Sequence, residues 1–190
     1  MSGTSLNALL FLISIVFDLY LLVLIIRFFL ALANAEYDHP FTQFVVKLTN
    51  FLVKPLRRFI PNFRGIEIAT IVLVLVIEII KFFIITTLRF GPPNLLGLIL
   101  LAIGDAIKLG LEVLSFIFLL QLIIYWLQPG SPINHILNQF TAPFMQPLKR
   151  LFANTNYVWL AWIFGFIILQ LLIIILINPL LAQGLIMAVG

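Results

Sequence analysis

Four long apolar runs dominate the sequence. They cover residues 6–32, 66–88, 95–127 and 157–177. A helix that crosses the hydrocarbon core of a bilayer needs about 20 largely apolar residues. The runs are continuous, whereas the strands of a membrane barrel would be shorter and would alternate with polar residues. The pattern therefore predicts an all-α membrane protein with four transmembrane helices.

The third run is longer than one span requires. A proline pair at positions 92–93 breaks the helix before it. We predict a third span at about residues 105–127, starting near Asp105, with residues 95–103 either re-entrant, interfacial or part of that span. The fourth span is predicted to end at residue 177, because an Asn-Pro pair follows it.

The composition supports a membrane protein. Of the 190 residues, 63% are hydrophobic and only 9% are charged, whereas soluble domains are about half apolar and a quarter charged. The first apolar run is too long for a signal peptide and no basic residue precedes it, so we expect it to stay uncleaved. The chain has no cysteine, which excludes disulfides, zinc-thiolate and iron–sulfur sites and cysteine nucleophiles.

The basic residues are unevenly placed along the chain. Seven of the eleven lie in two connections, residues 36–65 and 128–156: Lys47, Lys54, Arg57, Arg58, Arg64, Lys149 and Arg150. The connection between the second and third runs contains only Arg89. The positive-inside rule predicts that the two basic loops are cytoplasmic and that both termini lie outside the cytoplasm. Arg27, near the inner end of the first span, is expected to snorkel to the same face.

The two basic loops are copies of one segment. Residues 40–62 match residues 132–154 without gaps, at a constant offset of 92. The matched positions are Pro40 with Pro132, Thr49 with Thr141, Pro55-Leu56 with Pro147-Leu148, Arg57-Arg58 with Lys149-Arg150, and Asn62 with Asn154. We interpret the chain as two parallel repeats, residues 1–94 and 95–190, each a hairpin of two spans joined by a cytoplasmic loop.

Each repeated loop has the apolar spacing of an amphipathic helix. The apolar positions are Phe41, Phe44, Val45, Leu48, Phe51 and Leu52 in the first copy, and Ile133, Ile136, Leu137, Phe140 and Phe144 in the second. We expect each helix to lie in the inner membrane interface. Each is expected to end before Pro55 or Pro147, and Pro143 is expected to end or kink the second one sooner.

The basic loop residues are the candidate docking residues. They are Lys47, Lys54, Arg57, Arg58, Lys149 and Arg150. One interpretation makes the loops topological anchors and lids on the helix bundle. The other makes them a docking surface for anionic lipid head groups, or for a membrane or cytoplasmic protein partner.

The loop pattern Pro-(x)14-Pro-Leu-(Arg/Lys)-Arg, present in both copies, is similar to that of the YggT family of small bacterial membrane proteins, called YlmG in Gram-positive bacteria and plastids. The first copy also has the family's Pro61, whereas Ala153 stands at that position in the second. The resemblance covers almost the whole chain and implies a membrane-helical fold. It implies links to osmotic-stress tolerance, to septum or division factors and, in plastids, to nucleoid organisation and cytochrome maturation. It implies no particular reaction.

Charged residues inside spans are costly and are candidate functional residues. The candidates within the predicted spans are Asp18, Glu78, Lys81, Asp105, Lys108 and Glu112. Because both signs are present, they are expected to form a network of neutralising pairs or a path for an ion or proton. At the offset of 92, Gly110, Gln170 and Ile173 replace the first three, so the sequence does not predict a symmetric transport site.

The sequence contains no recognisable catalytic, metal or cofactor motif. His39 and His135 are not equivalent in the repeats, neither lies in a span, and no paired ligands accompany them. We therefore predict a protein without enzymatic activity or cofactor that binds no nucleic acid directly. Four helices bury a small interior, which leaves room for a homo-oligomer.

Two functions stay open from the sequence. One is a bacterial plasma (inner) membrane protein with docking loops, acting in osmotic-stress or envelope homeostasis or in division-associated organisation. The alternative is a small ion channel or transporter that uses the charges within the spans. An assembly factor for haem proteins or division machinery is suggested by the resemblance alone.

Overall fold

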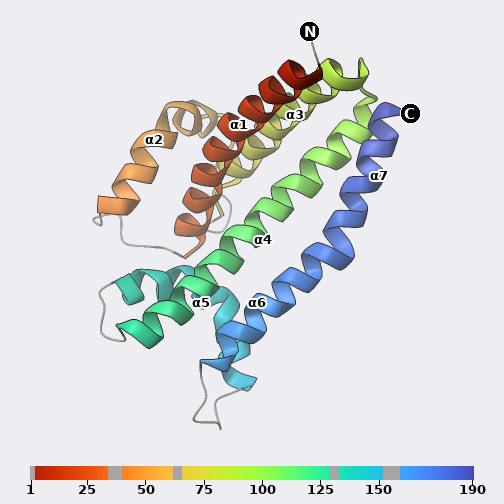
Figure 1. Ribbon diagram of the computed structural model, residues 1–190. Helices are drawn as coiled ribbons and strands as arrows, with labels where there is room; N and C mark the ends of the chain where they lie inside the picture. Colours follow the sequence, from red (N-terminus) through yellow and green to blue (C-terminus); the bar gives the residue numbers. More distant parts are fainter. Residues whose placement is uncertain (1–2, 34–39, 62–65, 129–132, 152–158) are drawn as a thin grey trace.

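The computed structural model describes residues 3–33, 40–61, 66–128, 133–151 and 159–190 (Figure 1). In chain order the helices are α1 (Gly3–Leu32), α2 (Pro40–Leu56), α3 (Ile68–Phe90), α4 (Leu95–Leu127), α5 (Ile133–Leu151), α6 (Leu160–Leu172), the π-helix η1 (Ile173–Ile177) and α7 (Asn178–Val189). The predicted all-α fold is confirmed. His39 lies outside the described residues, as does the side chain of His135.

Four helical segments are long and apolar enough to cross a membrane. They are α1, α3, α4 and the continuous segment formed by α6, η1 and α7. The amphipathic helices α2 and α5 follow the first and third of these segments. The structure thus has the predicted order of span, loop helix and span, twice over.

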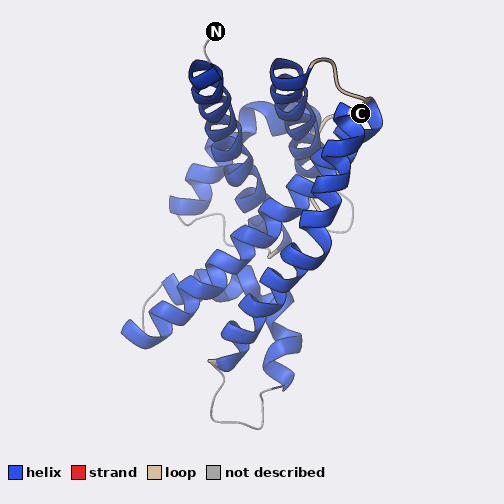
Figure 2. Ribbon diagram, turned by 45° about the vertical axis from the view of Figure 1, so that its right-hand side comes forward, coloured by secondary structure: helices blue, strands red, loops and turns tan. Residues whose placement is uncertain are grey.

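The two hairpins lie next to each other. Helix α1 packs beside α3, and α4 packs beside α6 and α7, while contacts between α3 and α4 join the hairpins (Figures 1 and 2). The start of α1 and the end of α7 lie at one end of the molecule, with α5 at the other (Figure 1). A chain that crosses a membrane an even number of times has both of its ends on the same side, and this placement of the two ends agrees with four crossings.

The loop helices belong to the apolar core. Val45 and Val53 of α2 are buried with Leu21 and Leu24 of α1 in the larger cluster. Phe29, near the end of α1, contacts α5, with ring centroids 5.6 Å from Phe140 and 5.9 Å from Phe144. A smaller cluster between α4, α5 and α6 comprises Leu114, Phe118, Met145, Trp162 and Leu169. Helix α5 therefore contacts both hairpins.

The helix that contains the third predicted span begins at Leu95. The Asn94 side chain accepts a hydrogen bond from the Leu96 backbone N–H at 2.9 Å and so caps the helix. At Gly97 the backbone of α4 approaches that of α7 so closely that a Cβ atom would overlap Ala188. Residues 95–103 are therefore a continuous part of α4 packed on α7, and not a re-entrant segment.

The helix of the fourth predicted span does not end at residue 177. Helix continues through Asn178 and Pro179 to Val189. A proline inside a helix lacks an N–H donor and crowds the preceding turn. The π-helix at Ile173–Ile177 widens that turn, which is a common way to accommodate such a disruption.

Proline also fails to end the two loop helices where predicted. Pro55 lies inside α2, one residue before its end. Pro143 and Pro147 both lie within α5, which continues to Leu151. A proline removes one intrahelical hydrogen bond and bends the axis, and at the end of a helix little structure follows to be disturbed.

Candidate functional site

A buried arginine joins the first hairpin to its loop helix. The guanidinium of Arg27 on α1 donates to both oxygens of Glu67, from Nε at 3.0 Å and from Nη2 at 2.9 Å. Its Nη1 donates to Thr49 Oγ1 at 2.7 Å and Asn50 Oδ1 at 2.9 Å, both on α2. Arg27 is only 5% exposed and Glu67 2%. The prediction that Arg27 snorkels is wrong, because its partners are inside the protein.

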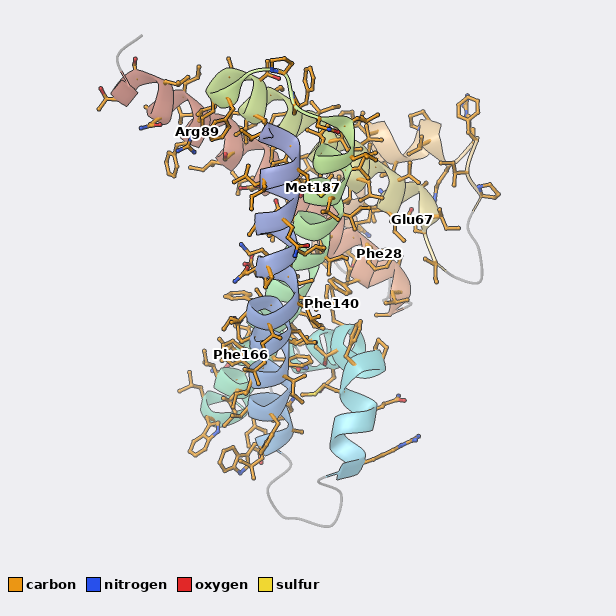
Figure 3. The ribbon with its side chains drawn as sticks, turned by 90° about the vertical axis from the view of Figure 1, so that its right-hand side faces the viewer. Phe28, Glu67, Arg89, Phe140, Phe166 and Met187 are labelled. Carbon is orange, nitrogen blue, oxygen red and sulfur yellow. The ribbon has the colours of Figure 1, made fainter. Side chains whose placement is uncertain are left out.

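Glu67 is shared by two arginines. Its Oε1 also lies 2.9 Å from Nε of Arg57, which is 40% exposed. Glu67 directly precedes α3, where α1, α2 and α3 meet (Figure 3). Burial opposes ionisation of this carboxyl, but the hydrogen bonds and charge of Arg27 and the charge of Arg57 outweigh it, and its pKa is lowered from the ordinary value. Glu67 is therefore an anion at neutral pH.

A polar cavity adjoins these arginines. Its volume is about 180 Å³, and it lies between α1, α2 and the residues that precede α3. Its polar lining comprises Arg27, Thr42, Asn50, Arg57 and Glu67. Thr42 is 1% exposed, and its hydroxyl has no hydrogen-bond partner among the described residues.

Helix α2 presents three different faces. The inward face consists of Thr42, Val45, Thr49 and Val53, all buried. The second is an exposed apolar stripe, formed by Phe41, Phe44, Leu48 and Phe51. The third is an exposed cationic stripe, formed by Lys47 and Lys54, which are seven residues apart and share one side of the helix, and continued by Arg58 in the turn just beyond its end. The single apolar face expected from the sequence is thus divided between protein interior and surface.

The structure separates the predicted docking residues. Arg57 turns toward Glu67 and the cavity, whereas its neighbour Arg58 is exposed. In the second copy Arg150 is exposed on α5, and the side chain of Lys149 lies outside the described residues.

A second charged cluster lies among α1, α3 and α4. Nζ of Lys81 is 3.0 Å from Asp18 Oδ1, 2.7 Å from Glu78 Oε2 and 2.5 Å from Asp105 Oδ2. Lys81 and Glu78 are buried, while Asp18 is 45% exposed at its side chain. With every group ionised, three carboxylates around one ammonium would have a net charge of −2.

Lys108 and Glu112 form a separate pair. Their closest approach is 3.7 Å, and both side chains are partly exposed. The six charges predicted as one network therefore form two groups. Asp105 joins Lys81 on α3 instead of Lys108, its neighbour one turn away on α4.

Sequence reasoning missed Glu67 and Thr42. Glu67 did carry a signal, since an acidic residue at the start of the second span faces the end of the first span in a hairpin, where Arg27 lies. Thr42 gave no such signal, because its burial depends on how α2 packs.

The comparisons place the chain among bacterial membrane proteins. Two parts of it, residues 6–88 and 100–180, match the CCB3/YggT family. The chain is 34% identical to an uncharacterized protein of Pseudomonas aeruginosa, PA0392, over 87% of this chain and 86% of the relative. It is 34% identical to a Vibrio alginolyticus protein from the proC 3' region, over 86% and 90%.

A third relative has the family name itself. The YggT protein of Escherichia coli K12 is 33% identical over 76% of each chain. No solved structure matches the chain. The two matched parts each cover one predicted hairpin, in agreement with the duplication. The protein with these two charged clusters and two loop helices is a multi-pass membrane protein of the CCB3/YggT family.

Proposed function

We propose that this protein is a non-enzymatic bacterial inner-membrane protein whose loop helices dock an acidic protein partner. This role belongs to osmotic-stress or envelope homeostasis, or to division-associated organisation. The observation that supports it is the division of α2 into an apolar stripe beside a cationic stripe. An amphipathic helix with this surface inserts its aromatic side into lipid and keeps its cations at the head groups and in water.

The anchoring of α2 supports a docking role. The hydrogen bonds from Arg27 to Thr49 and Asn50 fix α2 against α1. A fixed helix presents Lys47 and Lys54 in one orientation, with Arg58 in the turn at its end, which lowers the entropic cost of binding. Acidic partners are attracted to such a row at a distance, and the attraction weakens with salt.

Orientation is part of the proposal. We place the basic loop helices in the cytoplasm and both termini outside it, on the asymmetry of Lys and Arg between the connections. Single cysteines at Arg58 and Arg150 test this in the cysteine-free chain. Both should be labelled by an impermeant thiol reagent only after the inner face is opened. Labelling of the two positions from opposite faces would overturn the parallel repeat.

Photo-crosslinking in living cells tests the docking surface. A photoreactive amino acid replaces Lys47 or Lys54 in the cationic stripe, or Phe44 or Phe51 in the apolar stripe. We expect protein adducts from the cationic positions only, and lipid adducts from the apolar ones. The adduct formed at Lys54 should disappear when Lys47 and Arg58 are both changed to Gln.

The same charge change tests the physiological role. A strain that depends on the K47Q/K54Q/R58Q variant should lose growth after osmotic upshift or show division defects, at unchanged protein level. A control replaces Lys108 and Glu112, partly exposed charges of α4, with Gln. Equal growth of both strains, together with no adduct at any cationic position, refutes the docking function.

A second function is supported by the Lys81 cluster. Three carboxylates around one buried ammonium leave excess negative charge, which favours uptake of a proton or cation. Flux into proteoliposomes measures ion movement directly. If the cluster conducts, Glu78→Gln abolishes the flux and Glu112→Gln leaves it unchanged. Flux no greater than in empty vesicles, over several ions and potentials, rejects this function.

A further inference from the structure

The cavity beside Arg27 and Arg57 has the features of a binding site. It lies between α1, α2 and the residues that precede α3, and it has room for several water molecules. Its lining includes Thr42, whose buried hydroxyl has no hydrogen-bond partner among the described residues. Buried polar groups are nearly always hydrogen-bonded to protein, water or ligand, so the cavity is expected to be filled by something polar.

The polar groups that line the cavity and lack a hydrogen-bond partner are mainly donors. Arg57 contacts Glu67 through Nε, and no described residue accepts from its two Nη atoms. Asn50 accepts from Arg27 through Oδ1, which leaves its amide N–H groups as donors. The oxygens of Glu67 already receive the two guanidinium groups. A ligand in this cavity therefore has to be rich in acceptors.

The charges select an anion. Arg27 and Arg57 supply two positive charges and Glu67 one negative charge, which leaves a surplus of +1 at the cavity. A surplus positive charge that lines a cavity attracts an anionic ligand. A phosphodiester has one negative charge and unprotonated oxygens, and the planar fork of a guanidinium matches phosphate geometry.

The second repeat attaches its loop helix without a counterpart of Arg27 or Glu67. There Thr141 on α5 contacts Gln121 on α4, a neutral side chain, at 3.1 Å. At the offset of 92, Leu119 and Trp159 replace Arg27 and Glu67. A neutral amide thus attaches α5, so the ion pair of Arg27 and Glu67 is not required to attach a loop helix, while Arg57 corresponds to Lys149, whose side chain lies outside the described residues.

We propose that this cavity binds the phosphate of an anionic membrane lipid head group. Leu30, Ala31 and Val46 complete its lining with apolar surface, and the apolar stripe of α2 lies on the outside of the same helix. A lipid has both the phosphate and the apolar part that such surroundings accommodate. The site uses Arg57 and the inward side of α2, so it does not depend on the docking of a protein at the cationic stripe.

Lipid retention by the purified full chain tests the proposal. Native mass spectrometry and nanodisc titrations compare phosphatidylglycerol with phosphatidylcholine, for wild type and for Arg57→Gln, Thr42→Val and Arg58→Gln. Arg58 is the matched control, because it is the adjacent arginine and does not line the cavity. We expect preferential binding of phosphatidylglycerol, a loss of about tenfold in Arg57→Gln, a loss of a few-fold in Thr42→Val, and less than about twofold change in Arg58→Gln.

A second set of titrations with soluble phosphates tests whether the ligand is a lipid or a free phosphate. Inorganic phosphate and glycerol 3-phosphate are added to delipidated protein in neutral detergent, and they are expected to bind far more weakly than the lipid. Equal binding of these soluble phosphates overturns the lipid assignment. Equal losses in Arg57→Gln and Arg58→Gln, or no preference for phosphatidylglycerol, overturn the site itself. Thr42→Val keeps the volume of the side chain, so it separates a lost hydrogen bond from a folding defect.

Discussion

Thr49 and Thr141, 92 residues apart, attach the two loop helices in the same way. Each hydroxyl lies within hydrogen-bond distance of the carbonyl oxygen four residues earlier, at 2.7 and 2.9 Å. Each also contacts a polar side chain of the preceding span, Arg27 for Thr49 and Gln121 for Thr141. The two copies therefore use one attachment point, charged in the first and neutral in the second.

Replacing these threonines by valine separates the two attachments. A hydrogen bond to a charged group contributes about 1.5–3 kcal/mol and a neutral one about 0.5–1.5 kcal/mol. We expect Thr49→Val to lower the free energy of unfolding by the larger amount and Thr141→Val by the smaller. Reversible unfolding in mixed micelles provides the measurement. A larger loss for Thr141→Val contradicts the assigned role of Arg27.

Removing the charge of Glu67 leaves two arginines without their shared anion. Breaking a buried pair by deleting one partner costs about 3–5 kcal/mol, and we expect Glu67→Gln to lose stability in this range. Glu112→Gln breaks a partly exposed pair with Lys108 and is expected to cost less than about 1 kcal/mol. Thermal unfolding of the detergent-solubilised variants compares them. Similar melting temperatures would show that Glu67 is not the counter-ion of a buried charge.

Lys81 is expected to be essential for insertion unless a carboxyl is removed with it. Lys81→Met leaves Asp18, Glu78 and Asp105 without their shared cation, and unpaired charges inside spans are unfavourable. We predict a severe loss of folded yield, partly restored when Glu78→Gln is added. Yield of monodisperse protein after solubilisation is the readout. A normal yield of the single variant would disprove the compensating role of Lys81.

Two glycines of α4 make a matched pair for the contact between α4 and α7. Alanine is favoured over glycine inside a helix by about 1 kcal/mol. At Gly110 the nearest atom to a new Cβ is 4.0 Å away, on Phe29, so Gly110→Ala should be neutral or stabilising. At Gly97 a Cβ would overlap the backbone of Ala188, so Gly97→Ala should cost about 1–3 kcal/mol. Equal unfolding free energies would mean that α7 does not pack here.

The sequence determined the elements that depend on local properties. Length and continuous hydrophobicity define a span, so four spans were predictable, and a gap-free repeat predicted two similar hairpins. Boundaries at prolines were less predictable, because the effect of Pro179 depends on whether the turn before it widens. That adjustment is the π-helix at Ile173–Ile177, in a segment that also packs against α4, and the proline alone does not predict it.

The candidate sites depended on tertiary structure. Periodicity placed Val45 and Phe44 on one apolar side of a helix, but packing buries Val45 and leaves Phe44 62% exposed. Likewise, Arg27 and Glu67 are 40 residues apart. The sequence does not say which residues of two antiparallel helices lie at the same height along the helix axes. Spacing along a helix is fixed by its own geometry, whereas a contact between helices depends on their relative rotation and height, which side-chain packing sets for the chain as a whole.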